Sequence, residues 1–204
     1  MNSIKNIIFD LGGIFLDVDY QKTEQAFIAA GVNNFAGLYA QDHASMLFED
    51  LETGKIAPPQ FYDAFRKLAN NNLSNQQIMD AWNAMLGNFL WDELHWLQNI
   101  QHKYRIFLYS NTNQIHYDAF SKTFREATGN KNFENFFIKA YYSHTFGMRK
   151  PYQASYQKLM QEQNLLPAQT IFIDDTIKNI QGAKLAGLQT IHLIPSQRVS
   201  QLGL

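Results

Sequence analysis

Four polar clusters hold the side chains of this sequence that are best suited to chemistry. Asp10 follows an apolar run and enters the glycine turn 12–13, and Asp174-Asp175 ends another apolar run. Between them lie Ser110-Asn111-Thr112-Asn113 and Gly147-Met148-Arg149-Lys150-Pro151. Several carboxylates in one place repel one another and normally need a cation, and oxygen donors without sulfur favour Mg²⁺. A fixed lysine beside a hydroxyl and backbone N–H groups suits a phosphoryl group, whose phosphorus the Asp10 carboxylate could attack.

The elements that must position these clusters are short buried strands. Apolar segments at 7–9, 104–109, 136–141, 170–173 and 190–194 predict five strands, and helical patterns at 92–101, 152–164 and 176–186 lie between them. This alternation predicts an α/β fold with a Rossmann-like parallel sheet. Parallel strands end at one edge of such a sheet, and open α/β folds bind ligands there. We therefore expect the four clusters to meet at that edge.

The stretch from about residue 20 to residue 90 is different, because it has helical spacing throughout and no convincing strand. Ser74-Asn75-Gln76-Gln77 has the spacing of a capping box, and Pro58-Pro59 separates two of the helices. We predict two units: a core formed by residues 1–18 and 92–204, and a helical cap at 19–91 inserted after the first strand. An insertion directly after a catalytic turn often acts as a lid.

Composition and length exclude several classes of function. The 204 residues suffice for one core with a modest insertion, and 46% hydrophobic residues indicate an ordinary folded globule. A formal charge of −1 gives no electrostatic footprint for nucleic acid, and no basic cluster or apolar run of about 20 residues indicates a membrane. The absence of cysteine excludes disulfides, thiolate nucleophiles and zinc–sulfur sites. No targeting segment stands out, so we expect a cytoplasmic protein. We expect it to be a monomer or a homodimer.

Each cluster also has a plain structural explanation when it is taken alone. Asp10 could begin a turn, residues 110–113 could be a polar turn, and Lys150 could be an exposed loop residue. Asp174-Asp175 could cap the helix that follows. Four such coincidences in this order, each at a strand end, are much less common than one shared site. The sequence therefore favours a common site.

Four motifs carry a family resemblance: Asp10-Leu11-Gly12-Gly13, Leu108-Tyr109-Ser110-Asn111, Lys150-Pro151 and Ile173-Asp174-Asp175. They resemble the motifs of the haloacid dehalogenase (HAD) superfamily over nearly the whole chain, with a C1-type cap after the first motif. More narrowly, the longer segments 110–113, 147–151 and 174–183 are similar to the branch that includes bacterial α-D-glucose-1-phosphate phosphatase and the amino-terminal phosphatase domain of soluble epoxide hydrolase. The resemblance implies a Mg²⁺-dependent phosphatase that hydrolyses a small phosphorylated metabolite, such as a sugar phosphate, through an aspartyl-phosphate intermediate.

The same resemblance implies the metal ligands. Asp10 is implied as the nucleophile and as one ligand of Mg²⁺. The backbone carbonyl of Gly12 and the carboxylate of Asp175 are implied as further ligands, with Asp174 close by or acting through water.

The resemblance also implies how phosphate is bound. Ser110 and the Asn111 amide are expected to bind the phosphoryl oxygens, and Lys150 to neutralise charge on the nucleophile and the phosphate. The segment Glu52-Thr53-Gly54-Lys55-Ile56 resembles a cap signature that faces the active site and helps to select the substrate. It fits a helix-terminating glycine turn about equally well.

Gly12 is a departure, because phosphatases of this superfamily usually carry a second Asp there as general acid and base. Such help is worth about 10²–10⁴-fold in rate, so its loss is expected to slow turnover without abolishing it. The resembling glucose-1-phosphate phosphatase group also lacks this Asp. Leaving groups that need little protonation, such as sugar 1-phosphates and aryl phosphates, would suit the site best. Asp17 could substitute, although a solvent-facing turn acid is the more common case.

Two other functions stay open from the sequence. Metal-independent 2-haloacid dehalogenases also lack the second Asp, but they typically carry Ser and Asn in place of the acid pair that this chain keeps at Asp174-Asp175. An uncompensated acid pair beside a nucleophilic carboxylate would be costly without a cation, which favours phosphoryl transfer. The second alternative is a protein that binds a phosphorylated ligand and hydrolyses it very slowly.

Residues outside the motifs give weaker signals. His116 and Tyr117 stand close behind the second motif and are worth testing. Aromatic side chains of the insertion could line a substrate pocket, although such residues more often belong to the core; these are Tyr20, Phe48, Trp82 and Trp91.

Overall fold

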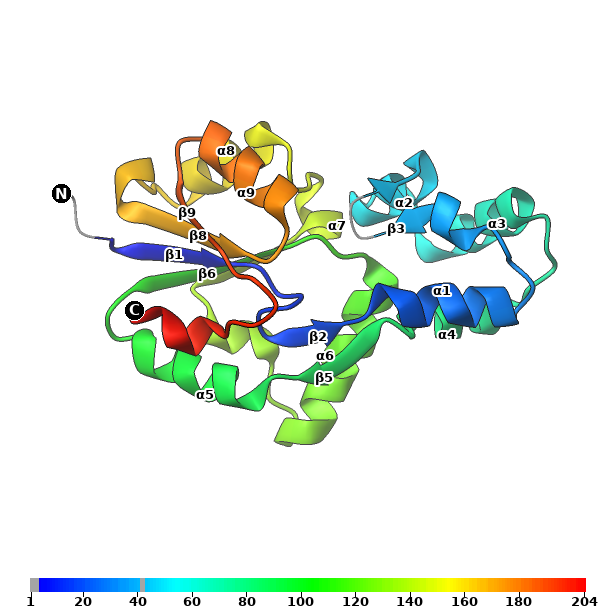
Figure 1. Cartoon of the computed structure of the whole chain (residues 1–204), viewed down its shortest axis with the longest axis horizontal. Helices are drawn as coiled ribbons and strands as arrows, with labels where there is room; N and C mark the ends of the chain where they lie inside the picture. The colour runs from blue at the N-terminus through cyan, green and yellow to red at the C-terminus, as the bar shows by residue number, and fades with distance from the viewer. Residues whose placement is uncertain (1–3, 41–42) are drawn as a thin grey trace.

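A parallel sheet of five strands forms the centre of the core, in a computed structural model that describes residues 4–40 and 43–204. The strand order is β7-β6-β1-β8-β9, and each neighbouring pair is parallel (Figure 1). The strands are β1 (Asn6–Phe9), β6 (Arg105–Ser110), β7 (Lys139–Tyr142), β8 (Thr170–Asp174) and β9 (Gln189–His192). The order confirms the expected Rossmann-like α/β fold, with the first strand in the middle.

Helices cover both faces of this sheet because its strands are apolar on both sides (Figure 1). The flanking helices are α5 (Trp91–Ile100), α6 (Gln114–Thr128), α8 (Gln153–Glu162) and α9 (Ile177–Leu185). Ile7 and Phe9 belong to the buried cluster under α5 and α6, whereas Ile8 belongs to the cluster under α8 and α9. Successive side chains of an extended strand point to opposite faces, which explains this division.

The inserted segment packs around its own aromatic core. Its helices are α1 (Tyr20–Ala29), α2 (Met46–Glu52), α3 (Pro58–Ala69) and α4 (Asn75–Asn83), with the 3-10 turn η1 (Phe35–Gly37) and the antiparallel pair β3 (Tyr39–Ala40) and β4 (His43–Ala44). Fully buried rings fill the space between them, including Phe27, Phe48, Phe61, Phe65 and Trp82. Each such side chain contributes roughly 1.5–3 kcal/mol by leaving water.

Two sequence signals in the cap are confirmed. Ser74 Oγ accepts a hydrogen bond from the Gln77 N–H at 3.2 Å, and Gln77 Oε1 accepts one from the Ser74 N–H at 2.9 Å. This capping box begins α4. Pro58 is the first residue of α3, where the missing N–H of proline leaves no helical hydrogen bond unmade.

The prediction of a strand-free insertion is wrong at β3, β4 and β5. β5 (Leu86–Phe89) pairs antiparallel with β2 (Leu16–Val18), and these two segments connect the core with the cap. Gly87 permits the close pairing, because a Cβ there would lie 2.8 Å from Asp17 Cβ. Strands of two to four residues are too short to give a periodic signal.

The ends of several predicted strands and helices differ in the structure. β7 begins at Lys139 rather than 136, because Phe133–Phe136 forms the 3-10 turn η2. The helix predicted at 152–164 is α8, which runs from Gln153 to Glu162. The chain also forms the short elements α7 (Ser143–Phe146), η3 (Pro167–Gln169) and η4 (Val199–Leu202). The residue limits of the two units, 1–18 with 92–204 and 19–91, stay a prediction.

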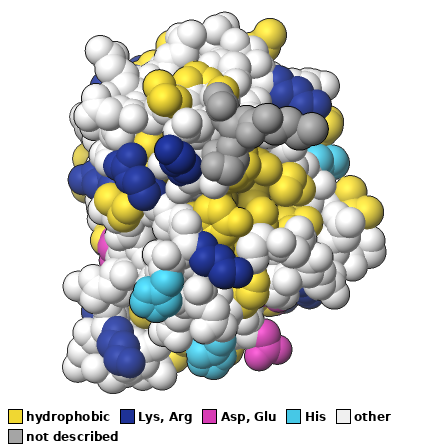
Figure 2. Space-filling view, turned by 90° about the vertical axis from the view of Figure 1, so that its left-hand side faces the viewer, with side chains coloured by type: hydrophobic (Ala, Val, Ile, Leu, Met, Phe, Trp, Pro, Cys, Tyr) yellow, Lys and Arg dark blue, Asp and Glu magenta, His cyan; other side chains and the backbone are white. Residues whose placement is uncertain are grey.

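The surface away from the carboxyl ends of the strands carries exposed apolar side chains. Figure 2 shows hydrophobic side chains gathered on the face at the left of Figure 1, where β1 begins. Ile138 and Leu166, which stand just ahead of β7 and η3, are mostly exposed. Among residues 4–40 and 43–204, no helix combines the length and the apolar character that crossing a membrane requires.

Candidate active site

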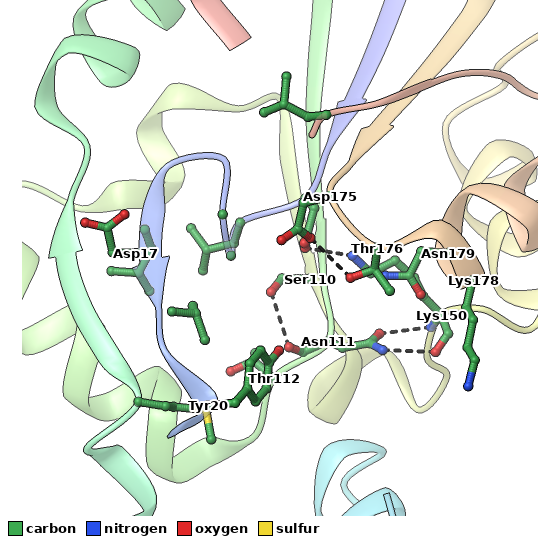
Figure 3. Close-up of a pocket in the computed structure, with 18 of the residues that line it drawn as sticks. Asp17, Tyr20, Ser110, Asn111, Thr112, Lys150, Asp175, Thr176, Lys178 and Asn179 are labelled. Atoms are coloured by element: carbon green, nitrogen blue, oxygen red, sulfur yellow. Dashed lines mark hydrogen bonds and ion pairs between the residues drawn. The ribbon is translucent and has the colours of Figure 1, made fainter. Parts of the chain in front are cut away.

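A cavity of about 830 Å³ lies at the carboxyl ends of the central strands, bounded on its other side by the cap. Asp10, Ser110, Asn111, Lys150 and Asp175 all line it, and Figure 3 shows the last four. The structure therefore brings the four sequence clusters to one place. They come from the ends of β1, β6 and β8 and from the loop before α8.

Lys150 lies between two carboxylates. Its Nζ donates hydrogen bonds to Asp10 Oδ1 and to Asp174 Oδ2, both at 2.7 Å. The Lys150 side chain is 1% exposed, and Asp174 is fully buried. Because Lys150 is buried, it is not the exposed loop residue that the sequence also allowed. A buried ammonium is stable only when it is paired, and the two carboxylates provide that pairing.

Asp174 is fixed from its other side by the start of α9. Its Oδ1 accepts a hydrogen bond from the Thr176 N–H at 2.8 Å. Asn179 Nδ2 lies 3.0 Å from each oxygen of the Asp174 carboxylate. Asp174 therefore holds Lys150 and bonds to the residue that precedes α9, but it is not the N-cap of that helix, which is Thr176.

Asp175 faces the cavity beside the glycine turn. A Cβ on Gly13 would lie 2.5 Å from Asp175 Oδ2, and the φ of Gly13 is +69°, so only glycine allows this approach. The backbone carbonyl of Asp175 accepts a hydrogen bond from His192 Nε2 at 2.8 Å. One oxygen each of Asp10, Asp174 and Asp175 lies within 4.8 Å of the others.

The electrostatics of the site follow from burial. Burial raises the pKa of Asp10 to about 7; Lys150 opposes this rise, and Asp174 and Asp175 add to it. Burial also raises the pKa of Asp175, and Asp174 adds to that shift. Burial would lower the pKa of Lys150, but the neighbouring Asp10 and Asp174 carboxylates outweigh it and raise that pKa. Lys150 stays charged, and one ammonium does not compensate three carboxylates.

The second cluster is held by its own hydrogen bonds. The Asn111 side chain contacts the backbone of Lys150, with Nδ2 donating to the Lys150 carbonyl and Oδ1 accepting from the Lys150 N–H, both at 2.9 Å (Figure 3). Ser143 Oγ bonds to the backbone N–H and carbonyl of Thr112 at 2.9 and 2.8 Å. The Ser110 hydroxyl has only a long contact, 3.4 Å, with the Asn111 carbonyl. Ser110 thus stands at the cavity on a rigid turn.

The cap side of the cavity includes Tyr39 and Glu49, which sequence reasoning missed. Arg149 forms ion pairs with Glu49 and Glu52 of α2, and Tyr39 donates a hydrogen bond to Glu52 Oε1 at 3.1 Å. Burial raises the pKa of Glu52, and Arg149 opposes that rise. No local pattern marks Tyr39 or Glu49. The segment 52–56 fits both expectations, because Glu52 faces the cavity and Gly54, with φ +68°, follows the end of α2.

Other sequence candidates lie elsewhere or play structural roles. Asp17 lines the edge of the cavity on β2 but is exposed, and its carboxylate points away from Asp175 in Figure 3. Tyr117 turns to Glu134, to which its hydroxyl donates at 2.9 Å. His116 lines the cavity but bonds to the Trp82 carbonyl and to Asn113.

The four aromatic residues divide in the same way. Phe48 and Trp82 are buried in the cap core, as expected of most such residues. Tyr20 lines the cavity. Trp91 is partly exposed and lines a separate, smaller cavity beside α5.

The fold and the acid–lysine site define a class of protein. A family model described as haloacid dehalogenase-like hydrolase matches residues 7–193. The chain belongs to this family of hydrolases.

Individual proteins and solved structures show which members of the family this chain is similar to. D-ribitol-5-phosphate phosphatase of Bacteroides thetaiotaomicron is 29% identical over 188 residues, which are 92% of this chain and 90% of that protein. The crystal structure of a HAD family enzyme from the same species, an aspartate-to-alanine variant in complex with magnesium and inorganic phosphate, has a TM-score of 0.92 at 29% identity. That match covers 99% of this chain and 100% of the other. The L-2-haloacid dehalogenase of Xanthobacter autotrophicus, at 16% identity and a TM-score of 0.60, covers 93% of this chain and 77% of its own, and shares the fold alone.

Proposed function

We propose that this protein is a Mg²⁺-dependent phosphomonoesterase, which hydrolyses a small phosphorylated polyol or sugar through a phosphorylated Asp10. The observation that carries the proposal is the contact of Asp10 with the buried ammonium of Lys150, beside a second and a third carboxylate. The phosphatase relative and the magnesium–phosphate complex of a similar structure support it.

The donor set fits a hard divalent cation. Three carboxylates surround one ammonium, so two negative charges lack a counter-ion at a largely buried site. Because Asp174 is occupied by Lys150, Thr176 and Asn179, we assign Mg²⁺ to Asp10, Asp175 and the Gly12 carbonyl, with Asp174 close by. Bound there, Mg²⁺ would neutralise charge on the phosphoryl oxygens.

The chain's own residues account for the chemical steps. An Asp10 oxygen forms a bond to phosphorus while the ester bond to the substrate alcohol breaks, which leaves an acyl phosphate on Asp10. Lys150, held at 2.7 Å from Asp10, balances the charge of the nucleophile and of the phosphoryl group. The Ser110 hydroxyl and the Asn111 backbone amide bind the other phosphoryl oxygens. Water then attacks phosphorus, releases inorganic phosphate and restores the Asp10 carboxylate.

Protonation of the departing oxygen is the weak step of this site. Gly12 offers no carboxylic acid, so the proton comes from water. The exposed Asp17 points away from Asp175. Turnover is therefore expected to favour leaving groups that are stable as anions, such as those of aryl phosphates and sugar 1-phosphates.

The cap residues that line the cavity, together with Arg149 of the core, support a polyhydroxylated leaving group. Tyr20, Tyr39, Glu49, Glu52 and Arg149 place hydroxyl, carboxylate and guanidinium groups around a cavity that is much larger than phosphate. Such groups bind hydroxyls by hydrogen bonds, whereas a haloacid would need a small, largely apolar site. The named substrate of the relative, D-ribitol 5-phosphate, is a phosphorylated polyol and is our first candidate for the bound ligand. Its primary alkoxide is a poor leaving group, so its turnover is expected to be slower than that of para-nitrophenyl phosphate.

The experiment is a comparison of substrates at saturating Mg²⁺. Inorganic phosphate is measured with D-ribitol 5-phosphate, glucose 1-phosphate and para-nitrophenyl phosphate, and halide is measured with 2-chloropropionate. Phosphate release from at least one ester, with no halide release, is the expected result. Halide release without metal would establish dehalogenation instead. Calorimetric binding of the phosphate esters without phosphate release over hours would establish a binding protein.

A further inference from the structure

The Asn111 side chain is joined to the backbone of a residue 39 positions away. It donates to the Lys150 carbonyl and accepts from the Lys150 N–H, each at 2.9 Å, so both ends of the amide are used on one residue. This pattern resembles a pair of strand hydrogen bonds and fixes the Lys150 backbone in two directions.

The other end of Lys150 is fixed independently. Its ammonium lies 2.7 Å from Asp174, whose carboxylate is held by Asn179 and by the Thr176 N–H. Lys150 therefore runs between two anchors: Asn111 at the backbone and Asp174 at Nζ. Loss of the backbone anchor would let the chain around residue 150 move, and the ammonium would then shift from its place between Asp10 and Asp174.

We propose that the Asn111 side chain is a positioning residue for Lys150 and not a ligand of the phosphoryl group. This inference rests on the proposed function for its kinetic part. Only the backbone amide of Asn111 then faces phosphate, while the side chain holds the lysine where it balances charge on Asp10. A misplacement of about 1 Å at a catalytic group can cost roughly 10²-fold in rate.

Asn113 provides a matched control in the same turn. Its Oδ1 accepts a hydrogen bond from the His116 N–H at 3.1 Å, and it caps the start of α6. Asn113 is buried and makes no described contact with Lys150. Asn113→Ala removes this N-cap bond and the buried hydrogen bond to His116 Nδ1, so it is expected to lower stability by about 1–3 kcal/mol and to leave kcat within about 3-fold.

The test is a double-mutant cycle of Asn111→Ala and Lys150→Ala, measured as kcat and KM with para-nitrophenyl phosphate. We expect Asn111→Ala alone to lower kcat by about 10- to 100-fold with little change in KM. In the Lys150→Ala background, the same substitution is expected to change kcat less than about 3-fold, because its effect passes through the lysine. Equal losses in both backgrounds would overturn the proposal and indicate a direct phosphate contact.

A second measurement does not depend on activity. Hydrogen exchange of the Lys150 N–H is followed in wild type, Asn111→Ala and Asn113→Ala. Exchange is expected to be faster only in Asn111→Ala, and unchanged exchange there would contradict the proposed anchor. Asn111→Asp, which keeps the acceptor for the Lys150 N–H but loses the donor to its carbonyl, is expected to keep slow exchange. If wild type showed no phosphatase activity, the proposed function would fail. The exchange measurement would still show whether the Asn111 side chain holds the Lys150 backbone.

Discussion

Arg149 of the core is paired with Glu49 of the cap: its Nη1 lies 2.5 Å from Glu49 Oε1, and its Nε lies 3.0 Å from Glu52 Oε2. The Arg149 and Glu52 side chains are 15% and 4% exposed, so this contact is largely removed from water. A buried pair is costly to break from one side, because the remaining charge has no partner. Since Arg149 precedes Lys150, the contact connects the position of the cap with the loop that carries Lys150.

Removal of the Arg149 charge is expected to destabilise the folded protein. Arg149→Met leaves Glu52 buried without its cation, and a loss of about 3 kcal/mol in unfolding free energy is expected by urea denaturation. Adding Glu52→Gln removes the stranded charge and is expected to restore more than half of that loss. Lys55→Gln, which breaks the exposed pair with Asp50 inside the cap, is the control and should change little. Equal stability of Arg149→Met and wild type would contradict a stabilising contact.

An acid introduced at position 12 is expected to accelerate poor substrates. The Gly12 backbone does not require a positive φ, and its Cβ would meet only Val18 Cγ2, at 3.2 Å. Gly12→Asp, combined with Val18→Ala to make room, should raise kcat with alkyl phosphates about 10-fold or more and leave aryl phosphates nearly unchanged. Both substrate types are compared by initial rates of phosphate release. Unchanged rates with alkyl phosphates in a folded variant would count against the missing-acid explanation.

Stability is expected to fall between pH 7 and pH 4 because of His116. Its Nε2 must donate to the Trp82 carbonyl, which only accepts, so Nδ1 accepts from Asn113 and the ring is neutral. Burial lowers the pKa of His116 to about 4. The unfolded chain takes up this proton near pH 6.5, so stability is complete above that pH and falls as pH drops towards 4, by about 2–3 kcal/mol.

The measurement for His116 is the urea midpoint as a function of pH. His116→Gln can still donate to the Trp82 carbonyl but has no proton to gain, so it should show a smaller loss between pH 7 and pH 4. The difference between the two pH profiles isolates this group from the other acids. Parallel profiles would show that His116 does not cause the acid sensitivity.

Much of the core and the site could be predicted from the sequence because the signals are local. Each of Asp10, Ser110 and Asp174 stands where an apolar run ends, and parallel strands bring their ends together. The order of the strands within the sheet was not predicted, because it depends on which distant segments pair. The short pair of strands β2 and β5 was not predicted, because three or four residues are too few to show a reliable hydrophobic periodicity.

The cap side of the cavity and the internal anchors could not be predicted, because they depend on contacts between distant segments. Arg149 meets Glu49 one hundred positions away, and Tyr39 reaches Glu52 only after α2 packs beside β4. The motif around Asn111 indicates an amide near phosphate but does not show that its side chain bonds to Lys150. Such pairings follow from three-dimensional packing and not from spacing in one motif.

The most direct test of the proposed function is phosphate release from D-ribitol 5-phosphate and para-nitrophenyl phosphate by wild type and Asp10→Asn, each with Mg²⁺ and with EDTA. Asn keeps the size of Asp10 and a hydrogen-bonding oxygen for Lys150, so the variant should stay folded, as circular dichroism can verify. Wild type is expected to release phosphate only with Mg²⁺, and Asp10→Asn to lose at least about 10³-fold in rate, because the nucleophile is gone. Full activity of Asp10→Asn, or wild-type activity unaffected by EDTA, would contradict a Mg²⁺-dependent reaction through Asp10.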